Sequence, residues 1–362
     1  MSKLRIIKRR QFLLSLVSLM GSWLASNACG GCISRAFSTM ITDHHKRRKS
    51  TSSIVEVFHP GATDGTGGKD NINLNDEALR QMVDEGIKAF TGKKDLKEAW
   101  SDIIPDPKKK IAIKINCQVV GIYTKAKVVK PIIDGLLIRG VNPENIIVYD
   151  KTDNAFSYAG FSRNGGEGVK AGTVKDFGGY HRFLYSRLAT LLTGKGIFSG
   201  QRYYCDYLIN VPVLKALDGF SGVTISMKNH YGSIANPHDH HKDMMTYIPE
   251  LNNLKYIKEK TRLVIVDAIF LGYKTKKEKG NRGKGSRDQR YIDILNELII
   301  SDDPVAVDFF GWQIIEEKRK ERGLPKVSPE PVFIHEAARM GLGISDPKKI
   351  NKITINMTNN NI

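Results

Sequence analysis

The chain has 362 residues, 41% of them hydrophobic and 26% charged, so it can bury a large core and is neither fibrous nor wholly disordered. Its formal net charge of +18 favours an anionic partner, although a solvated basic surface alone would give the same charge. No repeated C-x-x-C pattern occurs in the body of the chain, which excludes a zinc ribbon or a ferredoxin-type cluster there. We interpret Cys117 and Cys205 as buried small hydrophobes, with a disulfide or two ligands as alternatives.

The N-terminus has the pattern of an export signal. Arg9 and Arg10 stand before Gln-Phe-Leu, which resembles the twin-arginine signal, although Lys8 and Leu14 depart from its usual residues. The apolar run 12–25 is shorter than the ~20 residues of a membrane-spanning helix. The pattern therefore predicts a secretory signal peptide.

This interpretation places the signal peptide at 1–28 and a basic linker at 29–53. We expect the twin-arginine translocase to export the protein to the periplasm, or to the outer side of the inner membrane. Cleavage after Ala28 with a lipid on Cys29 and plain cleavage are the two alternatives. The basic arm 44–49 suits an anionic membrane surface.

Apolar runs alternate with helical patterns from residue 54 onward. In chain order the patterns predict strand 54–58, helix 78–90, strand 110–116, helix 125–140, strand 145–150, helix 181–192, strands 206–212 and 222–228, helix 245–257, strand 262–270, and helices 304–323 and 331–343. The continuous apolar strands predict an α/β fold over 54–362, with a mostly parallel sheet and helices on both faces. Similar strand ends suggest two related Rossmann-like halves, 54–200 and 201–362, or a coincidence.

Helix ends are marked by capping residues and prolines. We expect Asn75 or Asp76 to cap the first helix and Asp303 to cap the helix that begins at 304. Pro131 should disturb its helix, and Pro249 should break another.

The segment 274–290 is glycine-rich and strongly cationic, so we expect an exposed loop. It contains no aromatic residue on which a base could stack, and the chain shows no nucleic-acid-binding motif. Nucleic acid is therefore not an expected partner.

Ligands of open parallel sheets bind outside the carboxyl ends of the strands. The expected strand ends carry side chains that bind metals, hold anions or move protons: Asn116, Cys117, Asp150, Asp153, Asn210, Lys228, Asn229, His230, Asp267, Asp302 and Asp303. Each has a purely structural alternative, such as a helix cap at Asp303 or an Asx-turn at Asp150.

The candidate roles follow from residue chemistry. Lys228 and His230, two residues apart, place a cation beside a group that titrates near neutrality, which suits catalysis on an anion. The expected substrate-binding residues are Lys114, Asn116, Lys215 and Asn229. The candidate ligands of a divalent metal, whose identity stays open, are Asp150, Asp267, Asp303, His230 and His241.

A second histidine cluster lies at 238–241 and matches no standard zinc motif. Metal ligation, with His241 and Asp243 as the better members, and a mobile lid over the site are alternative interpretations.

Two segments, VPVLKALDGFSGVTISMKNHYGSI and SDDPVAVDFFGW, resemble a prokaryotic family known only as domain of unknown function 362. The shared motifs fall at Lys215, 222–224, Lys228, Asn229 and 303–308, and the likeness extends from about residue 54 onward. It implies a fold and a motif map but no reaction. The chain lacks the histidine that many relatives carry soon after the first lysine, and it lacks the cysteine cluster of others, so no iron–sulfur role is carried over.

Two functions fit these observations. The first is an exported metal-dependent oxidoreductase or hydrolase that acts on a small anionic substrate. The second is a non-catalytic metal- or anion-binding protein of the cell envelope. A weaker third reading is a peripheral membrane protein held by its basic segments.

Overall fold

The computed structural model describes residues 50–65, 73–118, 122–152, 156–181, 184–194, 203–274 and 291–359. The predicted export signal, Asp153 and nearly all of the basic loop lie outside these residues. The described part of the chain has no helix that is both long and apolar enough to cross a membrane.

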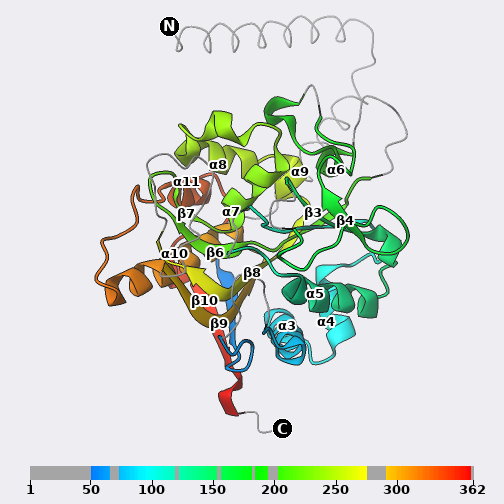
Figure 1. Ribbon diagram of the computed structural model, residues 1–362, viewed down its shortest axis with the longest axis horizontal. Helices are drawn as coiled ribbons and strands as arrows, with labels where there is room; N and C mark the ends of the chain where they lie inside the picture. The colour runs from blue at the N-terminus through cyan, green and yellow to red at the C-terminus, as the bar shows by residue number, and fades with distance from the viewer. Residues whose placement is uncertain are drawn as a thin grey trace, which may run out of the picture. The chain divides into compact units, whose positions relative to one another are not determined.

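A ten-stranded sheet forms the centre of the domain (Figure 1). Its main path runs β10-β1-β9-β8-β5-β2-β3-β4, and β6 and β7 extend the sheet beside β8. The strands are β1 Ser52–Phe58, β2 Ile111–Lys114, β3 Ile146–Asp150, β4 Lys170–Thr173, β5 Tyr207–Asn210, β6 Val213–Leu217, β7 Gly222–Thr224, β8 Thr261–Gly272, β9 Ile292–Ser301 and β10 Ile350–Asn356. Within the described ranges, six strand pairs are parallel and three are antiparallel. The predicted α/β fold with a mostly parallel sheet is confirmed.

Helices pack on both faces of this sheet (Figure 1). One face is covered by α3 Asp76–Thr91, α4 Leu96–Ile103 and α5 Ala126–Arg139, whose Leu79 and Trp100 are fully buried. The other face is covered by α6 Thr190–Thr193, α8 Met244–Asn252, α9 Lys255–Lys258, α10 Pro304–Glu321 and α11 Phe333–Arg339. The two apolar layers hold the strands in place, so that the strand ends form a fixed edge.

The capping predictions are confirmed, and the proline predictions are not. Asn75 accepts hydrogen bonds from two backbone amides at the start of α3, and Asp303 does the same for α10. However, α5 continues through Pro131 and α8 through Pro249. The break after α8 falls instead at residue 253, before α9 begins.

Two predicted elements are wrong. Over the described residues 184–192, the predicted helix 181–192 is replaced by short helical turns, because Ser186 and Arg187 adopt positive φ angles of 70° and 43° that no α-helix contains. The strand predicted at 222–228 stops at Thr224, and a helical turn, α7 Ser226–Asn229, follows it. The sharp turn at Ile225 redirects the chain across the end of the sheet.

The carboxyl ends of three central strands lie level with one another. Lys114, the last residue of β2, pairs with Tyr149 of β3 and with Asn210 of β5. The chain then passes through Pro212 and continues as β6 along β8, so β5 and β6 behave as one interrupted strand. The predicted halves stay a prediction, because β1 lies between β9 and β10 and strands of both ranges share one sheet.

Candidate functional site

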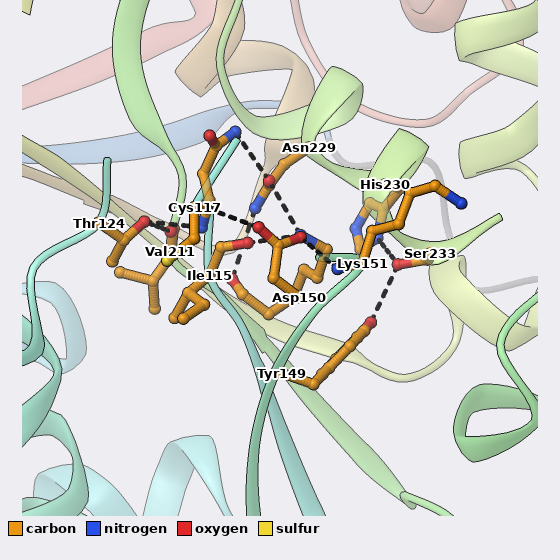
Figure 2. A network of polar contacts seen from close by, with 12 residues as sticks. Ile115, Cys117, Thr124, Tyr149, Asp150, Lys151, Val211, Asn229, His230 and Ser233 are labelled. Atoms are coloured by element: carbon orange, nitrogen blue, oxygen red, sulfur yellow. Dashed lines mark hydrogen bonds and ion pairs between the residues drawn. The ribbon is translucent and has the colours of Figure 1, made fainter. Parts of the chain in front are cut away.

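A buried ion pair lies at the centre of this edge. The ammonium group of Lys114 is 2.6 Å from a carboxylate oxygen of Asp150, and the two side chains are 0% and 5% exposed. The second oxygen of Asp150 accepts a hydrogen bond from the backbone amide of Cys117 at 2.5 Å (Figure 2). This pair joins β2 to β3 and fixes the base of the site.

Three asparagines connect this pair to α7. The amide oxygen of Asn229 accepts hydrogen bonds from Lys114 at 3.2 Å and from Asn116 at 3.1 Å. Its amide nitrogen donates to Asn210 at 2.7 Å, so one side chain reaches the ends of both β2 and β5. The oxygen of Asn116 in turn accepts from the ammonium group of Lys215 at 3.1 Å. The four predicted substrate-binding residues therefore form one connected network.

A second ion pair lies beside the first. Lys125 is 3.6 Å from Asp267, and its backbone amide also donates to that carboxylate at 3.0 Å. Burial lowers the pKa of Lys125, and the neighbouring carboxylate opposes this effect. The Cys117 thiol lies among these charges, and burial, together with the charge of Asp150, raises its pKa well above the ordinary value. Cys117 and Cys205 are both buried and are not disulfide-bonded, as predicted.

Two further lysines have no acidic partner in the described part of the chain. Lys215 and Lys228 are 8% and 7% exposed, and neither forms an ion pair with a described residue. Burial lowers the pKa of Lys215 to about 8, and the neighbouring carboxylate of Asp150 only partly opposes this. Burial and the charge of Lys215 lower the pKa of Lys228 to about 7. The ammonium group of Lys228 lies 3.5 Å from the centre of the Tyr231 ring.

The site therefore has more buried cations than anions. The cluster contains four lysines, Lys114, Lys125, Lys215 and Lys228. Only Asp150 and Asp267 pair with them among the described residues. An excess of buried positive charge is costly unless an anion compensates it. We call these four residues the lysine cluster.

The helical turn α7 is held in place from two sides. The carboxylate of Asp308, in α10, accepts hydrogen bonds from the backbone amides of Ser226 at 2.6 Å and Met227 at 3.1 Å. Burial raises the pKa of Asp308 to about 8, although both amide donors act in the opposite direction. On the other side, Gly232 lies so close to the Lys114–Asp150 pair that a Cβ atom there would be 2.6 Å from both charged groups.

His230 is closed off from solvent and is only 1% exposed. Its Nδ1 lies 3.5 Å from the hydroxyl of Ser233, which forms a 3.0 Å hydrogen bond with Tyr149 (Figure 2). Burial, and then the charge of Lys114, lowers the pKa of His230 to about 3. The imidazole is therefore neutral, and its catalytic role stays a prediction.

The second histidine cluster packs against aromatic rings. The His240 ring stacks on Tyr247 at 3.5 Å, and the His241 ring lies against Phe220 and Tyr231. Burial, followed by the charge of Lys228, lowers the pKa of His241 to about 4. His241 thus lies near the lysine cluster, and Asp243 lies 3.7 Å from the neighbouring His240.

The five candidate metal ligands are not gathered. In the part of the chain that the structure describes, no three His, Cys, Asp or Glu side chains are arranged to hold a metal ion. The carboxylate of Asp303 accepts hydrogen bonds from three backbone amides, those of Val305, Ala306 and Ile344, each at 2.9 Å. Asp150 and Asp267 are paired with lysines. The metal site stays a prediction without support from the donor geometry.

Three residues of the site were not assigned to it from the sequence. Lys125 follows no strand, so its position near Asp267 depends on the loop before α5. Asp308 belongs to a shared sequence motif within a predicted helix. Nothing in the sequence around it indicates that its carboxylate binds the backbone amides of α7. Tyr231 directly follows three predicted residues, 228–230, and could have been found as a ring next to a cation.

Comparison with known proteins identifies one family. Residues 111–313 match the family described as domain of unknown function (DUF362). This range is more than half of the chain and contains all four residues of the lysine cluster. No curated protein and no solved structure matches the chain.

Proposed function

We propose a function for this chain, which belongs to the DUF362 family, from the chemistry of its site, because the family description names no reaction. The protein binds a small anionic ligand at the carboxyl edge of its sheet. Lys215 and Lys228 supply the charge, while Asn229 holds Asn116 in place and Asn116 holds the ammonium group of Lys215. The observation that carries this proposal is that both lysines are buried without an acidic partner among the described residues.

The same charge balance argues against a metal-dependent reaction at this position. A divalent cation would have to enter beside Lys215 and Lys228 and would be repelled by both. The two nearby carboxylates already pair with Lys114 and Lys125. The donor set therefore does not fit a metal, and we derive no step through one.

Thermal unfolding of the purified full-length chain tests this proposal. Phosphate and malonate should each raise the melting temperature in a saturable manner, because a ligand that binds only the folded state stabilises it. Chloride at matched ionic strength controls for screening of the basic surface.

The matched variants are Lys215→Met and Lys255→Met. The first should abolish the anion-dependent shift, whereas the second removes an exposed lysine that also lies near a tyrosine ring and should leave the shift unchanged. Equal shifts in chloride, phosphate and malonate, or an undiminished shift in Lys215→Met, would contradict the proposal.

A further inference from the structure

The environment of Lys228 differs from that of the other lysines in the cluster. Lys114 and Lys125 each contact a carboxylate, and Lys215 donates to an amide oxygen. The ammonium group of Lys228 forms no hydrogen bond or ion pair with any residue that the structure describes, and its nitrogen lies over the Tyr231 ring at 3.5 Å.

We propose that Lys228 is a nucleophilic amine, which forms an imine with the carbonyl carbon of a small 2-oxo carboxylate bound at this site. This inference rests on the proposed function and names its substrate class. Lysines act as carbonyl nucleophiles when desolvation or a neighbouring cation favours the neutral amine, and Lys228 has both conditions.

The network also supplies a place for the carboxylate of such a substrate. Lys215 is fixed by its hydrogen bond to Asn116, and Asn116 is fixed by Asn229. Asn229 directly follows Lys228 on α7. The ammonium group of Lys215, which would hold the anion, is therefore connected through Asn116 and Asn229 to the helical turn that carries the amine. The charges of Lys215 and Lys228 interact, so a carboxylate held by Lys215 would bring its adjacent carbonyl towards the amine.

The chemistry balances without a further reactant. The nitrogen lone pair of Lys228 forms a bond to the carbonyl carbon, and the carbonyl electron pair moves to oxygen, which takes up a proton. The nitrogen gives up its two protons in turn: the first balances the proton already taken up by oxygen, and the second leaves with the hydroxyl group as water. A carbon–nitrogen double bond remains. One water is released for each imine formed, and nothing is oxidised or reduced.

Reductive trapping tests this inference on the full-length chain. We would incubate the protein with pyruvate and cyanoborohydride and map the modified lysines by peptide mass spectrometry. Lys228 should carry the reduced pyruvate adduct early and in preference to Lys255, an exposed lysine near a tyrosine ring. Malonate, which has the charge but no ketone, should protect Lys228 from labelling.

The variant Lys228→Arg tests whether the amine at position 228 is the nucleophile, and its label should be lost. The malonate-dependent thermal shift of the wild-type protein reports anion binding separately. If wild-type Lys228 is labelled no faster than Lys255 although malonate binds, the imine is wrong and anion binding stands. If neither malonate nor pyruvate binds, both proposals fail.

Discussion

At the scale of single residues, the protonation state of Lys228 should control anion binding. Its pKa is lowered to about 7, so the ammonium form that attracts an anion is present below that pH and is lost above it. Lys215, whose pKa is lowered to about 8, loses its proton next. The affinity for malonate should therefore fall as the pH rises through about 7 to 8. Calorimetric titration at several pH values checks this, and an affinity that is constant across this range would contradict it.

The same lowered pKa has a consequence for stability. Between pH about 7 and the ordinary lysine pKa of about 10.4, the unfolded chain binds the proton that folded Lys228 lacks, so this residue makes stability increase with pH. Without ligand, Lys228→Met should therefore stabilise the protein at neutral pH, on the order of 1–3 kcal/mol. The gain should shrink towards pH about 10. Denaturant unfolding of both proteins across this range measures the difference, and a destabilised variant at neutral pH would contradict the account.

Gly232 is required by close packing. A methyl group there would press on both members of the Lys114–Asp150 pair. Gly232→Ala should destabilise the protein by about 1–3 kcal/mol, the usual cost of overpacking. Gly165→Ala, at a position with open space around it, is the matched control. Equal unfolding midpoints for the two variants would show that the contact can relax.

At the scale of elements, the position of α7 depends on Asp308. Asp308→Asn replaces one acceptor oxygen with an NH₂ group that faces a backbone amide, so one of the hydrogen bonds to Ser226 and Met227 is lost. The expected loss of stability is roughly 1–3 kcal/mol. Anion affinity should fall roughly tenfold, which corresponds to about 1.4 kcal/mol. Glu321→Gln, at the exposed end of α10, is the control. Unchanged calorimetric affinity in Asp308→Asn would show that α7 is held by other contacts.

Elements with simple sequence patterns were predicted correctly. Elements whose conformation depends on tertiary contacts were not. Continuous apolar runs identified β2, β3 and β8, whereas β10 was missed because its apolar residues alternate at the edge of the sheet. The turn at Ile225 was missed because the next residue, Ser226, is held by a hydrogen bond to Asp308, which lies 82 residues further along the chain. Strand ends gave the substrate-binding residues, since parallel strands bring them together. No comparable rule predicts where the loop before α5 places Lys125.

At the scale of the whole molecule, the sheet combines distant parts of the chain. β1 and β10, at opposite ends of the described residues, pair in parallel over seven residues. Both lie outside the range matched by the family, 111–313, whereas the lysine cluster lies within it. The site is thus built by the family-typical part of the sheet, and the flanking strands extend it.

The N-terminal sequence gives a prediction about the whole protein in its cell. The pair Arg9→Lys and Arg10→Lys keeps the charge but removes the arginines that the twin-arginine pathway recognises. Export should be lost, and the uncleaved chain should accumulate in the cytoplasm. Cell fractionation with immunodetection measures this, and normal export of the double variant would show that another route carries the protein.

Anion binding by the lysine cluster is tested most directly by diffraction. Crystals would be soaked in selenate, an anion whose selenium gives an anomalous signal. The anomalous peak would show directly where the anion binds. The account predicts a peak whose oxygens lie about 3 Å from the ammonium nitrogens of Lys215 and Lys228. Well-occupied selenate only at exposed lysines, with none beside these two, would contradict it.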